Sequence, residues 1–220
     1  MRKKEQKVSI HPLQISKNVT GVCKLCFKPV SNLSFSNLFS PKILCENCKN
    51  ELNPHFRRSK LNGRNIYWFY SYNEAFRNAI YSLKGCGDFE MREIFLNDQA
   101  IFLKKFFCNR LVVPAPSYFE RDEKRGFNHV VSIFETMGLP LENCLIKTED
   151  RKQADLSKEE RAKIHEVIKL KNDSKLVGKR ILLVDDIMTT GSTIKACLKL
   201  LEAQKPRSIE VFVLARVART

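Results

Sequence analysis

The 220-residue chain has no apolar run long enough to cross a membrane, and no apolar segment follows its charged first residues. A membrane-spanning helix needs about 18 or more mostly apolar residues, and a secretory signal needs an apolar core after its basic start. Internal repeats and low-complexity tracts are also missing. These absences argue against an integral membrane protein, a secreted protein and a repeat array, so we expect a cytoplasmic protein without membrane insertion.

Acidic residues are scarce relative to basic ones: 24 Asp and Glu stand against 39 Lys and Arg, for a net charge of +15. The shortage is uneven along the chain. Residues 1–66 hold 13 Lys and Arg against 3 Asp and Glu, whereas residues 67–220 hold 26 against 21. A basic surface favours a polyanionic partner, and the first third of the chain carries most of the excess charge.

The strongest positive signal runs from Ile181 to Thr193. Four apolar residues precede Asp185 and Asp186, a hydroxyl-rich turn follows, and apolar residues then recur at helical spacing up to Lys205. This pattern predicts a buried strand, a turn and a helix, as in a parallel sheet covered by helices. Ligands of such sheets bind beyond the carboxyl ends of the strands.

The turn itself has the composition of a phosphate site. Its residues are Thr189, Thr190, Gly191, Ser192 and Thr193. The first backbone N–H groups of a helix attract anions, and glycine allows close approach of the backbone. Carboxylates beside such a site suit sugar hydroxyls or a divalent cation, so the expected ligand has a phosphate, a polyol and Mg²⁺. The alternative is a buried strand that ends in a solvated Asp-Asp turn.

Four of the eight cysteines form two Cys-x-x-Cys pairs, which 18 residues separate: Cys23, Cys26, Cys45 and Cys48. This spacing is typical of zinc sites, and four thiolates leave no open position, which indicates a structural metal. The segment between the pairs is too polar to form a core of its own, and metal binding can supply the missing folding energy. A redox pair or disulfides are the alternative.

Basic residues alternate with aromatic ones in the first third of the chain. Arg57, Arg58 and Lys60 are the nucleic-acid-binding candidates, and Phe27, Phe35, Phe39 and Phe56 are the stacking candidates. Single-stranded nucleic acid binds through phosphate contacts and base stacking. Solvated lysines and arginines with ordinary core phenylalanines explain the same pattern, and the sequence leaves the two interpretations open.

The rest of the chain has the pattern of alternating strands and helices. The expected elements are a strand at 66–72, a helix from Asn73 to Gly85, a helix over Met91–Phe106, a strand at 111–115, a basic loop at 121–129, a helix over 130–137 and a last strand at 208–214. The basic loop between a strand and a helix is a second possible anion site, with Lys124 and Arg125 as candidates. His129 and His165 stand alone, and we assign neither a catalytic role.

Two resemblances sharpen this interpretation. Asp185-Asp186 with Thr189–Thr193 resembles the phosphoribosyl pyrophosphate (PRPP) motif of type I phosphoribosyltransferases. The cysteine pairs, Val113-Pro114-Ala115-Pro116, Arg125-Gly126-Phe127-Asn128 and the Asp-Asp motif, in this order, are similar to the competence protein F (ComF/ComFC) family. That family usually has Gln where this chain has His129.

The resemblance implies an α/β fold: a type I phosphoribosyltransferase-like parallel sheet with helices on both faces, after a small four-cysteine zinc module. The expected divisions are a basic arm at 1–20, the zinc-binding module at 21–65 and the phosphoribosyltransferase-like domain at 66–220. In the family the acidic pair holds the ribose hydroxyls and the Thr-rich turn holds the 5′-phosphate. The pyrophosphate and hood candidates by resemblance are Lys124, Arg125, Arg151, Gln153 and Arg161.

The resemblance also implies a role in natural transformation and DNA uptake. We expect a protein that binds PRPP with Mg²⁺, carries a structural Zn²⁺, and binds single-stranded DNA through its basic zinc-containing region, with other competence proteins as partners. The alternative is an active phosphoribosyltransferase that transfers phosphoribosyl from PRPP to an unknown acceptor. No general base can be named from the sequence, and this favours the first hypothesis.

Overall fold

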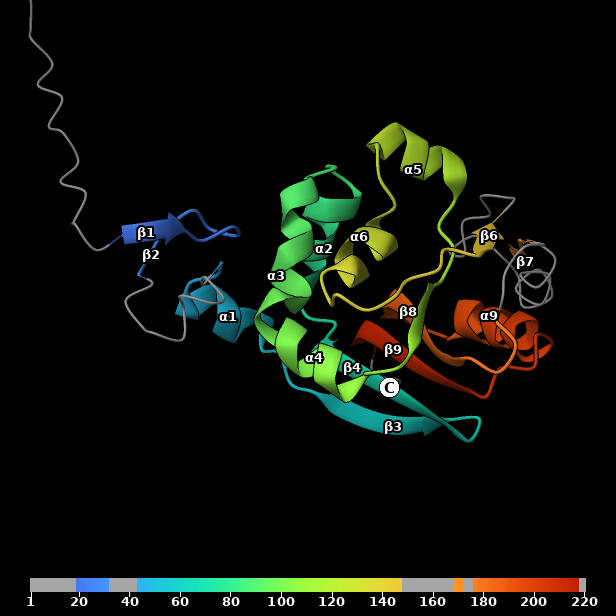
Figure 1. Ribbon diagram of the computed structural model, residues 1–220. Coiled ribbons are helices and arrows are strands. Elements are labelled where there is room, and N and C mark those ends of the chain that lie inside the picture. The colour runs from blue at the N-terminus through green and yellow to red at the C-terminus, as the bar shows by residue number, and fades with distance from the viewer. Residues whose placement is uncertain (1–18, 32–42, 148–167, 172–175, 218–220) are drawn as a thin grey trace, which may run out of the picture.

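The structure is a computed structural model, and it describes residues 19–31, 43–147, 168–171 and 176–217. The N-terminal part contains β1 (Val19–Val22), β2 (Pro29–Ser31) and α1 (Glu46–Leu52). β1 and β2 form an antiparallel pair. Figure 1 shows these elements together at one side of the molecule, next to the helices that cover the large sheet.

The large sheet has five strands in the order β3-β4-β9-β8-β5. Its strands are β3 (Arg57–Leu61), β4 (Arg64–Ser71), β5 (Leu111–Pro114), β8 (Arg180–Met188) and β9 (Ser208–Arg216). The parallel arrangement predicted from the sequence is confirmed for β4, β9, β8 and β5. β3 differs: it pairs antiparallel with β4 through the Asn62-Gly63 turn, whose two positive φ angles, 49° and 78°, suit a two-residue hairpin.

Period-two alternation along the buried strands divides the core into two layers. Leu182 and Val184 pack in one hydrophobic cluster, and Ile181 and Leu183 pack in the other. The first cluster is covered by α2 (Glu74–Lys84), α3 (Glu93–Leu96) and α6 (His129–Glu135), and the second by α9 (Ser192–Glu202). Helices therefore cover both faces of the sheet, as the sequence predicts (Figure 1).

The helix predicted after Asn73 is confirmed. The Asn73 side chain accepts a hydrogen bond from the backbone N–H of Phe76 at 2.8 Å, and Gly85 is the C-terminal cap residue. Asn is a favoured N-cap because its side-chain oxygen satisfies an unpaired N–H of the first turn. α2 buries Phe76, Ala79, Ile80 and Leu83, which confirms the apolar stripe as core.

The single helix predicted over Met91–Phe106 is wrong. The segment is broken into η2 (Phe89–Arg92), α3, η3 (Asn97–Gln99) and α4 (Ala100–Phe106), where η2 and η3 are 3₁₀ turns. Asn97 and Asp98 are weak helix formers, which favours a break at this point. Phe102 and Phe106 are 46% and 40% exposed, so the predicted stripe is not continuously buried.

The basic loop predicted at 121–129 is also wrong in part. Most of it is α5 (Phe119–Arg125), which ends at Gly126 with φ 84°. Glu, Lys and Arg are good helix formers, and glycine in the left-handed region is a common helix end. The remaining elements are the antiparallel strands β6 (Leu145–Lys147) and β7 (Ile168–Leu170). Within the described ranges, no helix is long and apolar enough to span a bilayer.

Candidate functional site

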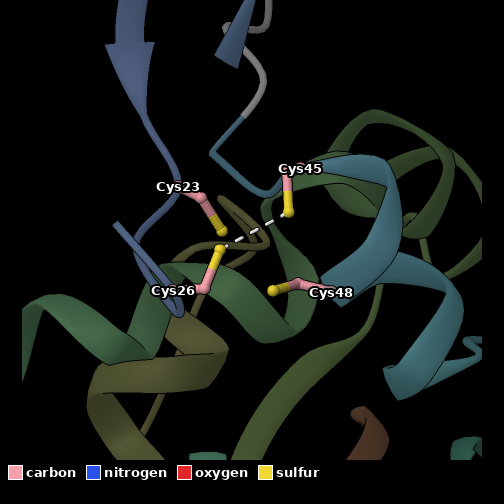
Figure 2. Close-up of side chains that lie close together, drawn as sticks. All are labelled: Cys23, Cys26, Cys45 and Cys48. Carbon is pink, nitrogen blue, oxygen red and sulfur yellow. Dashed lines mark hydrogen bonds between the residues drawn. The ribbon is translucent and has the colours of Figure 1, made fainter. Parts of the chain in front are cut away.

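The four paired cysteines converge on one point between the β1–β2 hairpin and α1. Cys23 and Cys26 lie in the turn after β1, while Cys45 caps the N-terminus of α1 and Cys48 lies within it. Their sulfur atoms all lie within 4.8 Å of one another, and the Sγ atoms of Cys26 and Cys45 are 3.6 Å apart (Figure 2). Around a tetrahedral zinc with ~2.3 Å bonds, sulfur atoms stand roughly 3.8 Å apart. The cluster therefore fits a metal such as zinc.

The backbone around Cys23 favours the thiolate that a metal requires. Burial raises the pKa of the Cys23 thiol, but backbone hydrogen bonds from Cys45, Cys26 and Leu25 outweigh it and lower the pKa to about 6. The turn is closed by the N–H of Phe27, which donates to the carbonyl of Cys23 at 2.8 Å. Thiolates, not thiols, are metal ligands, so this turn is built to hold one.

Two lysines next to the cysteines connect this cluster to the helices on the large sheet. The Nζ atom of Lys24 lies 2.7 Å from carboxylate oxygens of both Glu90 and Glu93. Lys49 forms an ion pair of 3.3 Å with Asp98. The two cysteine-containing segments are therefore attached to η2, α3 and η3 by ion pairs.

The predicted strand, turn and helix at the second site are confirmed. β8 runs to Met188, Gly191 adopts the left-handed conformation with φ 75°, and α9 begins at Ser192. α9 has no side-chain cap of the kind that helix starts usually carry, and the N–H of Ser192 reaches the Thr190 hydroxyl only at 3.4 Å. A helix that begins without a side-chain cap is a candidate anion site.

The two acidic residues are not at the strand end but inside β8. Consecutive residues of a strand point to opposite faces, and Leu183 and Val184 already belong to the two different core layers. Asp186 points to the α2 and α6 side, where its Oδ2 atom lies 2.6 Å from Nζ of Lys84 and 3.1 Å from Nε2 of His129. Asp185 lies on the α9 side, and its Oδ1 atom accepts the N–H of Asp186 at 2.9 Å.

These surroundings move the two carboxyl pKa values in opposite directions. Burial raises the pKa of Asp186, but the charge of Lys84 and the hydrogen bond with His129 outweigh it, so that the pKa falls well below its usual range. Burial and the negative charge of Asp186 raise the pKa of Asp185 well above its usual range. Asp186 is therefore ionised in the folded protein, whereas a cationic or hydrogen-bonding ligand would stabilise the charged form of Asp185.

Lys84 and His129 are the residues that sequence reasoning missed. His129 is 5% exposed, and its Nδ1 atom lies 3.0 Å from Nη1 of Arg125. A guanidinium group has only donors, so Nδ1 accepts and Nε2–H donates to Asp186. His129 thus positions the carboxylate. For His129, the one signal in the sequence was its difference from the Gln that is usual in the family. No feature of the sequence indicated that Lys84 belongs to the site.

The two residues predicted for a second anion site line one cleft, and whether that cleft binds an anion stays a prediction. Lys124 and Arg125 line a cleft of about 630 Å³ between α2 and α5. Lys124 is exposed, whereas Arg125 donates to the Lys84 carbonyl at 2.9 Å and to Asp122 at 3.3 Å. The hood candidates Arg151, Gln153 and Arg161 lie outside the described residues.

The nucleic-acid candidates lie on β3, at the edge of the sheet. Arg58 and Lys60 are exposed, while Arg57 points the other way and donates to the Phe69 carbonyl at 3.1 Å. Phe56 is half-buried and stacks on Tyr67 with ring centroids 5.5 Å apart, so it is part of the core. Phe27 is 74% exposed, and Phe35 and Phe39 lie outside the described residues.

Comparisons with known proteins agree with this arrangement. Residues 124–220 match the phosphoribosyl transferase domain family. The chain is 30% identical over 218 residues to competence protein ComFC of Bacillus subtilis (strain 168), covering 97% of this chain and 86% of that protein. It is 33% identical over 147 residues to competence protein ComFC of Streptococcus pneumoniae (strain ATCC BAA-255 / R6), covering 67% and 66%.

Among solved structures, hypoxanthine phosphoribosyltransferase from Staphylococcus aureus overlaps with a TM-score of 0.37 at 19% identity, covering 57% of this chain and 62% of that chain. The architecture described above is a phosphoribosyltransferase-type α/β fold preceded by a four-cysteine cluster.

Proposed function

Because this chain belongs to the ComFC family of competence proteins, we propose that it acts in natural transformation by binding PRPP and single-stranded DNA. One observation carries the PRPP part: a left-handed Gly191 turn without a side-chain cap opens α9 directly after the strand that holds Asp185 and Asp186. This arrangement offers amide groups to a phosphate and carboxylates to a sugar.

In this proposal the 5′-phosphate lies on the turn of Thr189, Thr190, Gly191, Ser192 and Thr193. Asp185 binds the ribose hydroxyls or Mg²⁺, and Asp186 supports it from a position held by Lys84 and His129. Mg²⁺, when bound with PRPP, would neutralise phosphate charge next to these oxygen ligands. Lys124 and Arg125, with the hood residues Arg151, Gln153 and Arg161, are the proposed pyrophosphate contacts.

The DNA part of the proposal rests on charge. The exposed Arg58 and Lys60 on β3, together with Arg57 and the excess of basic residues before residue 67, suit phosphate contacts with a single strand. The four cysteines are proposed to hold a structural Zn²⁺, which would stabilise the N-terminal elements that precede β3.

The test is isothermal calorimetry of the full chain with PRPP and Mg²⁺. The double variant Asp185→Asn/Asp186→Asn should lose measurable binding, because no carboxylate oxygen then faces the sugar. Asp88→Asn is the matched control: Asp88 is exposed and makes no side-chain cap bond, so the affinity should not change. Unchanged affinity in the double variant would remove the site from consideration.

The second candidate function is an active phosphoribosyltransferase, which the domain match over residues 124–220 favours. The turn would fix the 5′-phosphate, and Asp185 would orient the ribose. Cationic groups near α5 would stabilise the charge of the leaving pyrophosphate, so the rate would depend on positioning and electrostatics. Release of pyrophosphate from PRPP and Mg²⁺ in the presence of nucleobases or DNA would support turnover, and its absence with intact PRPP binding would support a binding role.

A further inference from the structure

The cleft between α2 and α5 has an unusual lining. Five cationic residues face it: Arg77, Lys84, Arg121, Lys124 and Arg125. Among the described residues that line it there is no carboxylate. Its volume of about 630 Å³ is in the range of small-molecule sites.

Helical spacing explains how the cations come together. Arg77, Tyr81 and Lys84 are four and three residues apart, which places them on one face of α2. Arg121, Lys124 and Arg125 have the corresponding spacing on α5. Two cationic helix faces that oppose each other repel, so this arrangement is stabilised when an anion lies between them.

Internal carboxylates neutralise only part of this charge. Lys84 is paired with Asp186 and Arg125 with Asp122. Arg77 and Lys124 are exposed and form no ion pair with another described residue. These two side chains stand on opposite walls of the cleft, which is the geometry that a phosphate group needs for contacts on two sides.

An exposed aromatic ring completes the lining. Tyr81 is 65% exposed, and its ring lies close to Gly85, where an added Cβ atom would come within 2.6 Å of Cε2. The absence of a side chain at Gly85 therefore leaves room for the ring. An exposed tyrosine ring beside cationic side chains is the pairing found in sites for single-stranded nucleic acid, because every base can stack on it.

We infer that this cleft binds a nucleotide unit of single-stranded DNA, with a base stacked on Tyr81 and the flanking phosphates held by Arg77 and Lys124. Lys124 is also a proposed pyrophosphate contact, so PRPP and DNA would compete for this side chain. The inference rests on the proposed DNA-binding function and gives it a second surface. β3 and α5 lie at opposite ends of the molecule in Figure 1, so one strand would have to cross the helical face to reach both.

The test is fluorescence anisotropy of the full chain with a labelled oligothymidylate. We expect Tyr81→Ala to weaken binding roughly tenfold and Tyr81→Phe to leave it unchanged, since a phenyl ring keeps the stacking face. Arg77→Ala should weaken binding and reduce the slope of log K against log salt by about 0.7. The control Lys179→Ala/Lys199→Ala removes two exposed cations outside the cleft and should have a smaller effect than either cleft variant.

The outcomes separate this inference from the proposed function. If the unmodified chain does not bind the oligonucleotide, the DNA part of the proposed function fails and the cleft assignment fails with it. If it binds and the cleft variants bind equally well, only the cleft assignment fails. The second measurement is the calorimetric affinity of the Arg77→Ala variant for PRPP. A loss of PRPP affinity with unchanged DNA affinity would assign the cleft to the small ligand and overturn the inference.

Photocrosslinking gives a readout that folding defects would not imitate. An oligonucleotide with 5-iododeoxyuridine should crosslink to the peptide that contains Tyr81 in the unmodified chain. Crosslinks confined to peptides of β3 would overturn the assignment.

Discussion

The Nζ atom of Lys84 lies 2.6 Å from Oδ2 of Asp186, although 102 residues separate them in the sequence. The same carboxylate oxygen is 3.1 Å from Nε2 of His129 on α6. Two helices are therefore attached to β8 through one carboxylate. This attachment lies directly behind Asp185, which is the acid proposed to face the ligand.

The first prediction concerns Lys84→Met. The methionine keeps the aliphatic packing but leaves Asp186, whose side chain is 8% exposed, without its cationic partner. Because the Lys84 side chain is 38% exposed and solvent screens the pair, we expect a loss of about 1–3 kcal/mol in the free energy of unfolding. Chemical denaturation at pH 7 measures it, and the double variant Lys84→Met/Asp186→Asn should recover part of the loss.

The pH dependence of this pair has a definite sign. The folded-state pKa of Asp186 is lowered, so its stabilisation is fully present above the unfolded pKa of about 3.9 and is lost as the pH falls toward the folded value. The free energy of unfolding should decrease below about pH 4 in the unmodified chain, and less steeply in Lys84→Met. Equal slopes would show that Asp186 does not depend on Lys84.

The second prediction separates the two acids. The folded-state pKa of Asp185 is raised, so ionisation at neutral pH destabilises the fold, and this cost appears as the pH rises above about 3.9. Asp185→Asn should therefore leave the melting temperature unchanged or raise it while it abolishes PRPP binding. Asp186→Asn should lower the melting temperature. A fall in stability of equal size in both variants would contradict the opposite roles of the two carboxylates.

Local patterns predicted the parts of the site that lie within one segment of the chain. The run from Ile181 to Thr193 contains its own strand, turn and helix signals, and the structure confirms each of them. The two Cys-x-x-Cys pairs likewise predicted the cluster of sulfur atoms. The start of the helix at Asn73 belongs to the same class, because it depends on the capping preference of one residue.

The missed parts depend on contacts between distant segments or on helices without a buried face. α5 has no buried residue, and Phe119 is 70% exposed, so no apolar period marked it as a helix. The apolar run before Asp185 suggested a strand that ends at Val184. Because β8 continues to Met188, Asp185 and Asp186 lie within the strand and point to opposite faces of the sheet. Lys84 reaches Asp186 only after α2 packs on the sheet, and no local pattern reports that contact.

The third prediction tests the turn before α9. Gly191→Ala should reduce the free energy of unfolding by about 1–2 kcal/mol, because φ 75° is unfavourable for a residue with a Cβ atom. It should also weaken PRPP binding, since the amide groups of the turn shift. Gly63→Ala is the matched control: its φ is 78° and no atom lies within 4 Å of the added Cβ. A comparable stability loss with intact PRPP affinity is expected there, and loss of affinity in both variants would point to a general folding defect.

The last prediction concerns the metal. Native mass spectrometry of the full chain should find about one zinc ion per chain, because four sulfur atoms within 4.8 Å of one another form one closed tetrahedral site. Cys45→Ser should reduce zinc content and the melting temperature, since metal binding supplies folding free energy to the small N-terminal elements. Cys108→Ser is the control, as Cys108 is exposed and outside the cluster. Full zinc occupancy in Cys45→Ser would exclude the four-thiolate site.

Lys24→Met should keep the zinc, but it removes the ion pairs with Glu90 and Glu93. We therefore expect faster proteolysis of residues 19–31 with unchanged metal content.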